Sequence, residues 1–249
     1  MKTTIVYRNT TFEVDLSKPI DISIPLRGKP ENVTAWYVNP PKFTPVMENG
    51  FIGDVNLGGA VNFRNIFFNP HGHGTHTECV GHISKEPYTI NQCLTQFFCY
   101  AKLVSIIPYN VDGDSIITFE QIKKVWSNNE ADAIIIRTLP NSDSKLTKQY
   151  SNTNPTFIHH EAMQYLIENG VQHLLIDTPS VDKEQDHGKL LAHHVFWEYP
   201  ENPRLDRTIT ELIFVDNTIA DDNYILQFQI ASFENDASPS KPVLYKIKT

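Results

Sequence analysis

The sequence lacks the features that would place the protein in a membrane, on a secretory route or on nucleic acid. No apolar run approaches the length of about 18 residues that a membrane-spanning helix needs. The amino terminus, MKTTIVYRNTTFEVDL, has no apolar stretch after its lysine and no small-residue cleavage site, so we expect no signal peptide. The 29 acidic residues outnumber the 21 basic ones, and the resulting net charge of −8 argues against a nucleic-acid-binding protein.

Cysteine is scarce as well. Three cysteines, at positions 79, 93 and 99, are too few and too odd in number for a disulfide framework, so we expect a reducing, cytoplasmic compartment. The chain has no C-x-x-C pair, no G-x-S-x-G, no G-x-G-x-x-G and no Walker A motif. A zinc finger, a serine hydrolase, a dinucleotide-binding domain and a P-loop protein are therefore disfavoured.

The composition that remains is that of a folded globular protein. Hydrophobic residues make up 40% of the 249 positions and aromatic residues 11%, which is enough apolar material for a sizeable core. The sequence shows no internal repeat, no low-complexity tract and no flexible linker. We therefore predict a single mixed α/β domain that spans residues 1–249.

Short Val/Ile/Leu runs predict a buried parallel sheet in the middle of the chain. These runs cover residues 100–107, 133–137 and 174–177. Between the last two, apolar residues recur at helical spacing over 158–169, and Gly170 follows where a helix C-cap belongs. Strand, helix and strand in this order indicate a parallel βαβ unit.

Weaker patterns predict the other elements. They are, in chain order, strands at 3–7 and 11–14, an irregular proline-rich loop over 28–50, a hairpin or strand pair within 51–69, a helix over 118–128, and strands at 212–215 and 224–231. The loop is long enough to reach a neighbouring subunit.

Four of the ten histidines fall within residues 71–82, in the segment HGHGTHTECVGH. Imidazoles beside a carboxylate suit zinc, manganese or iron. If residues 75–82 form a strand, His76, Glu78 and His82 share one face and Cys79 points to the other. A lone histidine is more often structural, but this density beside a carboxylate favours a metal and proton-transfer site. A thiol hydrolase built on Cys79 and His82 is disfavoured because these side chains point to opposite faces.

Further ligands are expected from the second half of the chain. Asp177 ends a predicted buried strand, where α/β proteins tend to place groups that face ligands. His193 and His194 lie in an apolar stretch, and either one could face a pocket. Glu211 lies in an apolar, strand-like run, where a carboxylate costs free energy unless it is paired or metal-bound. An exposed strand position is the alternative reading of Glu211.

The histidine-rich segment is similar to a family signature of the form H-x-G-T-H-x-D-x-P-x-H. Gly74-Thr75-His76 match its G-T-H, His82 matches its closing histidine, and Glu78 stands at the aspartate position. On this segment the chain resembles the cyclase family of metal-dependent hydrolases, which includes bacterial kynurenine formamidase and isatin hydrolase.

Other blocks extend this resemblance over nearly the whole chain. The segment DISIPL at 21–26 is similar to the family's D-L-S-x-P-L, and IDTPSVD at 176–182 to its G-I-D-T-P-S-x-D. Ala192-His193 and Glu211-Leu212 resemble the two later blocks, which supply ligands. Any one block is weak evidence, whereas several in the family's order are specific.

The chain departs from the signature in ways that indicate a divergent branch. The position of the leading histidine is occupied by Gly72, and the nearest candidates are His71 and His73. We favour His71, with one inserted residue absorbed by a local bulge at Gly72, and His73 is the alternative. Glu78 is one methylene longer than the family's aspartate, and Val80 replaces the proline.

The resemblance implies a swivelling β/α/β fold with a mixed sheet and flanking helices. It also implies one or two divalent metal ions per chain, zinc as the first choice and manganese as the second. The implied ligands are His71, His76 and Glu78 for one ion, and Glu78, His193 and Glu211 for the other.

The activity implied by the resemblance is hydrolysis of an amide or formamide by metal-activated water, with His82 as the proton shuttle. The family's best-known reaction converts N-formylkynurenine to kynurenine and formate. The alternatives are hydrolysis of a cyclic amide such as isatin and a non-catalytic relative that binds a metal or a small ligand. The expected partner is a small aryl amide, and the expected assembly is a homodimer or homotetramer.

Overall fold

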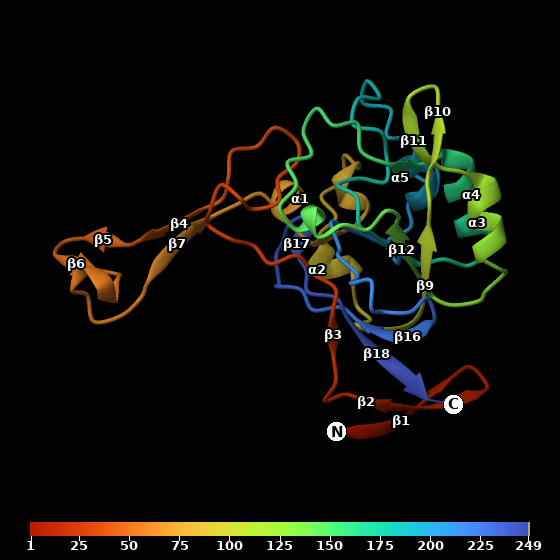
Figure 1. Cartoon of the computed structure of the whole chain (residues 1–249), viewed down its shortest axis with the longest axis horizontal. Helices are drawn as coiled ribbons and strands as arrows, with labels where there is room; N and C mark the ends of the chain where they lie inside the picture. Colours follow the sequence, from red (N-terminus) through yellow and green to blue (C-terminus); the bar gives the residue numbers. More distant parts are fainter. Residues whose placement is uncertain (249) are drawn as a thin grey trace.

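One long mixed sheet organises the computed structural model, which describes residues 1–248 (Figure 1). In order across the sheet, its strands are β1 (Lys2–Tyr7), β2 (Thr10–Asp15), β18 (Val243–Lys248), β16 (Asn223–Gln227), β9 (Phe98–Ile106), β12 (Ala133–Thr138), β14 (His173–Ile176), β15 (Thr208–Glu211), β8 (His76–Glu78) and β17 (Ala237–Pro239), with β3 (Ile20–Asp21) paired to β18. The N-terminal strand pair agrees with the prediction.

The centre of the sheet is parallel and its two sides are antiparallel. β9, β12, β14 and β15 run parallel, and β16 and β8 join them in antiparallel pairs. The predicted βαβ unit is present, because α4 (His160–Glu168) connects the adjacent parallel strands β12 and β14. α3 (Phe119–Val125) and α5 (Leu191–Trp197) pack beside α4. The structure is therefore the mixed α/β fold with flanking helices that the sequence predicts.

β12 and β14 are apolar at successive positions because both faces of the sheet are covered. On β12, Ile134 and Ile136 pack into the core beneath α3, α4 and α5, whereas Ala133 and Ile135 pack into a second core on the opposite face. Alternate side chains of a strand point to opposite faces, so a continuous run of buried residues requires two cores.

A slender arm projects from the body of the molecule (Figure 1). β4 (Lys42–Pro45) pairs with β7 (Arg64–Phe67), and β5 (Met47–Glu48) pairs with β6 (Phe51–Ile52) beyond them. The prediction of an irregular loop over 28–50 is therefore wrong from residue 42 onward. Asn49 and Gly50 have φ values of 50° and 82°, which suit the tight turn of a hairpin, and Asn-Gly is a typical sequence of such a turn.

The possible strand at 75–82 ends earlier than its pattern indicates, and the strand predicted at 212–215 does not form. β8 stops at Glu78, and residues 80–82 form a 3₁₀ turn instead of continuing the strand. This turn requires Gly81, since a Cβ there would lie 2.0 Å from the carbonyl oxygen of Tyr88. The strand predicted at 212–215 is replaced by β15, which ends at Glu211 because Leu212 has a left-handed φ of 53°.

The remaining elements are short. They are η1 (Val55–Leu57), α1 (Pro70–His73), η2 (Val80–His82), α2 (Ile90–Cys93), β10 (Tyr109–Val111), β11 (Asp114–Ile117), η3 (Asp143–Leu146) and β13 (Phe157–Ile158). Within residues 1–248, no helix combines the length and the apolar character that crossing a bilayer would require.

Candidate metal centre

The candidate site is built where β15, β8 and β17 lie side by side at one end of the sheet. In the antiparallel register His76 stands opposite Glu211 on β15, and Glu78 stands opposite Ile209. The intervening Thr77 points to the other face, where its hydroxyl contacts that of Thr210 at 2.8 Å. Strand alternation thus brings His76, Glu78 and Glu211 to one face, and all three are buried.

The one-turn helix α1 points the side chains of His71 and His73 in different directions. Asn69 caps the helix by accepting a hydrogen bond from the Gly72 N–H. His71 points into the cluster, and its Nδ1 lies 3.1 Å from Glu78 Oε2. His73 points away, with Nδ1 accepting from the Asn69 N–H and Nε2 donating to the Asn39 carbonyl. The structure therefore gathers His71 with the cluster and uses His73 to hold the loop.

The helix α5 likewise points the side chains of His193 and His194 in different directions. His193 is buried, and its Nε2 lies 3.1 Å from Glu78 Oε1. Its Nδ1 contacts Asp182 Oδ2 at 2.6 Å. His194 faces elsewhere, since its Nδ1 donates to the carbonyl of Tyr199.

Glu78 lies at the centre of these contacts. Its Oε2 faces His71 and its Oε1 faces His193, while His76 Nε2 lies 3.9 Å from Oε2 and 3.5 Å from Glu211 Oε2. The second oxygen of Glu211 accepts a hydrogen bond from the Val181 N–H at 2.9 Å, which fixes the carboxylate.

His82 reaches the cluster through the 3₁₀ turn rather than along a strand face. Its Nδ1 lies 3.8 Å from Glu78 Oε2, and its ring is tilted over that of His71 with a centroid distance of 4.4 Å. Its side chain is 29% exposed, which makes it more accessible than His71, His76 and His193.

Asp236 is part of the cluster and was missed from the sequence. Its Oδ2 lies 2.9 Å from His71 Nε2 and 3.2 Å from His82 Nδ1. It directly precedes β17, and its carbonyl accepts from the Cys79 N–H beside β8. No motif surrounds Asp236, so only the pairing of β17 with β8 reveals its role.

Imidazoles and carboxylates in the cluster stabilise each other's charged forms. Burial lowers the pKa of the His71 imidazole, but Asp236 and Glu78 outweigh this effect and raise the pKa to about 10. Burial opposes ionisation of Glu78 and Asp236, but the surrounding histidines hold the pKa of both carboxyls well below the usual range. Burial is likewise outweighed at His193, where Asp182 and Glu78 raise the pKa well above its ordinary value.

Two atoms of the cluster show that the donor set fits a metal ion. His76 Nε2 and Glu78 Oε2 are buried, and neither makes a hydrogen bond of acceptable geometry with the described residues, although His71 Nδ1 lies 3.1 Å from Glu78 Oε2. The other nitrogen of His76 faces the Gly74 carbonyl at 3.1 Å, which leaves Nε2 with a free lone pair in that tautomer. Buried polar atoms without partners are costly, and a cation between them would satisfy both.

Several ligand atoms approach one another closely enough to share such an ion. The groups are His71, His76 and Glu78; Glu78, His82 and His193; and His71, His82 and Asp236. The imidazole ligands favour zinc, and the carboxylate ligands suit manganese as well.

Asp177 does not join the cluster. Its carboxylate accepts from the Thr138 N–H and hydroxyl, and Lys145 Nζ lies 2.7 Å away. Asp177 and Lys145 thus form a structural ion pair at the end of β14. Cys79 points into the core, away from Glu78, as strand alternation predicts.

Fold and site together define an α/β protein with a buried histidine–carboxylate cluster suited to a divalent metal. The Cyclase family model matches residues 14–183, more than half of the chain. The chain therefore belongs to the Cyclase family.

Solved structures share this fold at low sequence identity. An isatin hydrolase bound to the product analogue thioisatinate has a TM-score of 0.68 and 13% identity, covering 93% of each chain. Isatin hydrolase A from Ralstonia solanacearum has a TM-score of 0.66 and 14% identity, covering 92% of this chain and 91% of the other. A protein described as a predicted metal-dependent hydrolase, from Bacillus stearothermophilus, has a TM-score of 0.62 and 18% identity, covering 92% of this chain and 98% of the other. No curated protein sequence matches this chain.

Proposed function

We propose that the protein is a metal-dependent hydrolase that cleaves the carbon–nitrogen bond of an aryl formamide or a cyclic amide. The observation that carries the proposal is the pair of buried atoms that make no hydrogen bond with the described residues, His76 Nε2 and Glu78 Oε2, at the centre of the cluster. Structural relatives described as isatin hydrolases and as a predicted metal-dependent hydrolase support the same reaction class. The proposed substrate is N-formylkynurenine, and isatin is the second candidate.

The proposed ligand sets follow from the contacts of Glu78, which faces a histidine with each oxygen. His71, His76 and Glu78 would hold one ion, and Glu78, His193 and Glu211 a second. Zinc is the proposed metal and manganese the alternative. When bound, such a metal lowers the pKa of water and polarises a carbonyl group.

We assign proton transfer to His82. Asp236 occupies Nδ1 of this imidazole, which leaves Nε2 to take a proton from the attacking water and return it to the departing amine nitrogen. The partial exposure of His82 lets it meet substrate, whereas His76 and His193 are enclosed.

The test is metal content and activity of the purified chain. We expect at least one zinc or manganese ion per chain, and release of formate from N-formylkynurenine or ring opening of isatin. Chelation should abolish turnover and either metal should restore it, and His194→Ala should behave like the wild type. Less than one ion per chain, together with no activity after zinc or manganese is added, would overturn the proposal.

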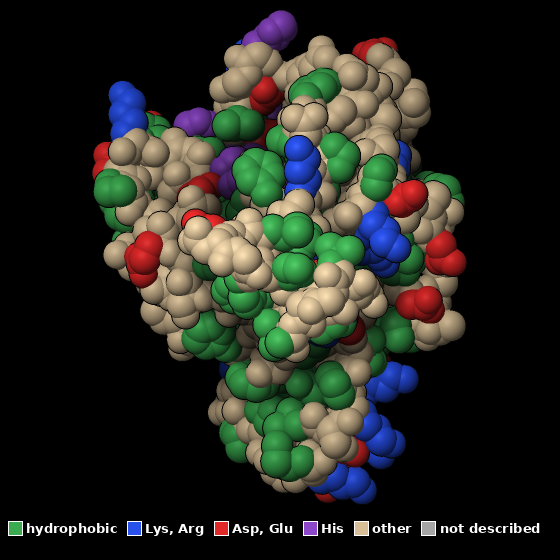
Figure 2. All heavy atoms as spheres, turned by 90° about the vertical axis from the view of Figure 1, so that its left-hand side faces the viewer, with side chains coloured by type: hydrophobic (Ala, Val, Ile, Leu, Met, Phe, Trp, Pro, Cys, Tyr) green, Lys and Arg blue, Asp and Glu red, His purple; other side chains and the backbone are tan. Residues whose placement is uncertain are grey.

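We also propose that the arm, residues 42–67, joins two copies of the chain. Large apolar side chains are exposed along it: Met47, Phe51, Val55, Leu57, Val61, Phe63, Ile66 and Phe67. Figure 2, which views the molecule from the arm's side, shows hydrophobic side chains gathered across this face. A two-stranded ribbon is only marginally stable alone, so an exposed apolar arm needs a partner surface.

A second copy is the proposed occupant because the arm leads through Phe68 and Asn69 directly into α1 and His71. Two arms exchanged across a two-fold axis would cover each other's apolar residues. Sedimentation should give twice the chain mass for the wild type and a monomer for Phe63→Asp. Val6→Asp, at an exposed apolar residue of β1, is the control and should remain dimeric. A monomeric wild type would contradict the assembly but not the hydrolase.

The free thiols at positions 79, 93 and 99 fit the cytoplasmic location that we propose.

A further inference from the structure

His71, His82 and Asp236 form a separate group of potential ligands beside the central atoms of the cluster. The Asp236 carboxylate lies between the two imidazoles, with Oδ2 2.9 Å from His71 Nε2 and 3.2 Å from His82 Nδ1. The ligand atoms of a tetrahedral zinc ion lie about 3.3 Å apart, because each zinc–ligand bond is about 2.0–2.1 Å long. The spacing of these three side chains therefore suits a cation without a large rearrangement.

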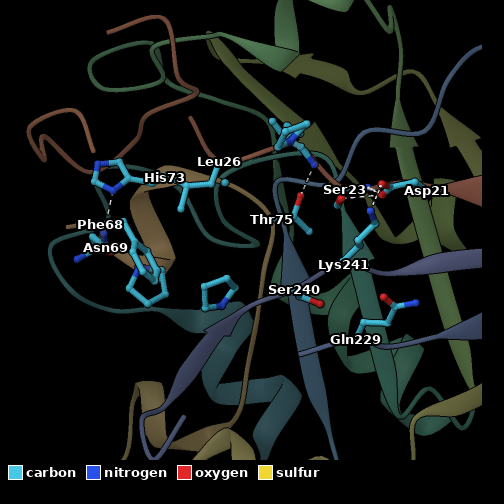
Figure 3. Close-up of a pocket in the computed structure, with 15 residues that line it drawn as sticks. Asp21, Ser23, Leu26, Phe68, Asn69, His73, Thr75, Gln229, Ser240 and Lys241 are labelled. Carbon is cyan, nitrogen blue, oxygen red and sulfur yellow. Dashed lines mark hydrogen bonds and ion pairs between the residues drawn. The ribbon is translucent and has the colours of Figure 1, made fainter. Parts of the chain in front are cut away.

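Three segments that are distant in the sequence hold this group in place. α1 supplies His71, η2 supplies His82, and the residue before β17 supplies Asp236. α1 contributes only one of its two imidazoles, because His73 is turned toward the Asn69 backbone at the edge of a cavity of about 300 Å³ (Figure 3). The pairing of β17 with β8 holds the Asp236 carboxylate beside both of the other imidazoles.

This group is open to solvent, unlike the ligands at the centre of the cluster. The side chains of His71, His82 and Asp236 are 19%, 29% and 25% exposed, whereas those of His76 and Glu78 are fully buried. An ion bound here would keep water among its ligands and would exchange with solvent. It would also displace the Nε2 proton of His71 when Nδ1 of that ring already binds the central ion. We therefore expect weaker binding here than at the centre.

We propose that His71, His82 and Asp236 bind an additional, weaker Zn²⁺ ion that inhibits the enzyme. The inhibition rests on the proton-transfer role proposed above for His82. A neutral imidazole carries one ring proton, so when Nδ1 binds a cation that proton is on Nε2. Nε2 of His82 then has no lone pair with which to accept a proton from water. Excess zinc would thus stop the reaction that a lower zinc concentration supports.

Equilibrium dialysis of the whole protein against rising Zn²⁺, followed by metal analysis, tests the site without any substrate. We expect one more ion per chain at excess zinc than the number retained after desalting. Asp236→Asn and His82→Ala should each lose this additional ion. His82→Ala should keep the retained ions, because His82 is not among the ligands proposed for them. Glu234→Gln is the matched control, since Glu234 lies two residues before Asp236 and contacts Thr89 instead, and it should bind the additional ion.

Turnover gives the second readout. In the wild type and in Glu234→Gln, saturation with excess zinc should lower the turnover number about 10²- to 10⁴-fold, the loss expected when general acid–base catalysis is removed. Removal of the excess should restore it, and the turnover of Asp236→Asn should not respond to excess zinc.

The inference is overturned if dialysis finds no additional ion, if either variant still binds it, or if turnover persists while it is bound. An ion that both variants retain would be an adventitious ion elsewhere on the surface. Absence of hydrolysis at every zinc concentration would overturn the proposed function and the inhibition with it, whereas the ion count would still decide whether the site exists.

Discussion

Asp182 and His193 form a carboxylate–histidine pair with Oδ2 and Nδ1 2.6 Å apart. The same carboxylate accepts from the backbone N–H groups of Ala192 and His193, which ties it to the start of α5. The contact fixes the imidazole so that Nε2 faces Glu78. Asp236 acts in the same way on His71, whose Nδ1 faces Glu78. Two such pairs therefore converge on one carboxylate, an arrangement typical of metal sites.

Asp182→Asn is expected to weaken zinc binding about 10- to 100-fold, because an outer carboxylate sets the orientation and basicity of the histidine that it contacts. The asparagine oxygen can still accept from the backbone, so α5 should keep its start. Competition with a chromophoric chelator measures the affinity. Asp206→Asn, at a half-exposed carboxylate that pairs with Arg204, is the control. Equal affinity in Asp182→Asn and wild type would show that His193 is not a ligand.

Glu78→Asp restores the residue type of the family signature but should reduce zinc affinity by about tenfold. Each oxygen of Glu78 lies 3.1 Å from a histidine nitrogen on a different helix. Removing one methylene withdraws the carboxylate from both, and α1 and α5 are held by their own caps and packing. Zinc titration of both proteins measures the change. Tighter binding by the aspartate variant would show that the helices adjust to the shorter side chain.

The fold was largely predictable because its central elements are strongly patterned. β9, β12 and β14 carry short runs of Ala, Val, Ile and Leu, and α4 carries a regular apolar stripe that ends before Gly170, whose φ is 87°. The arm was not predictable in the same way, since its apolar residues are exposed and have no core to impose a period. The left-handed backbone conformation of Leu212, which ends β15, could not be predicted from the pattern of apolar and polar residues either.

Parts of the cluster that lie on one strand were accessible from the sequence. Alternation places His76 and Glu78 together, and the resemblance pointed to His193 and Glu211. The orientation of His71 depends on one turn of helix and not on the bulge expected at Gly72. Asp236 was inaccessible because its place depends on strand pairing between distant segments, which no local pattern encodes.

His82→Ala should lower the turnover number about 10²- to 10⁴-fold while metal content stays at the wild-type level. The side chain provides proton transfer in the proposed mechanism, and the other histidines of the cluster remain to hold the metal. Metal analysis together with formate release from N-formylkynurenine and ring opening of isatin gives both quantities. His194→Ala is the matched control. Unchanged activity in His82→Ala, with metal still bound, would remove His82 from the mechanism.

We expect the free energy of unfolding to depend on pH through the protonation of His173, a histidine outside the cluster. His173 begins β14, is buried, and has its Nδ1 2.9 Å from the Thr208 hydroxyl. Burial lowers its pKa from 6.5 to about 4, against the weaker opposing effect of Asp132 and Asp206. Between these values the unfolded chain binds a proton that the folded chain excludes, so stability falls as the pH falls. The difference of 6.5 − 4 = 2.5 corresponds to about 3 kcal/mol.

His173→Gln cannot take up that proton, so its unfolding free energy should decline less steeply than that of the wild type between pH 7 and pH 4. The variant loses packing and is expected to be less stable at pH 7, which makes the slope, not the absolute value, the decisive quantity. Urea unfolding in the presence of a chelator measures it without a contribution from bound metal. His187→Gln, at an exposed histidine, should keep the wild-type slope. Identical slopes for His173→Gln and wild type would mean that the folded chain protonates His173 as readily as the unfolded chain does, and burial would then not lower its pKa.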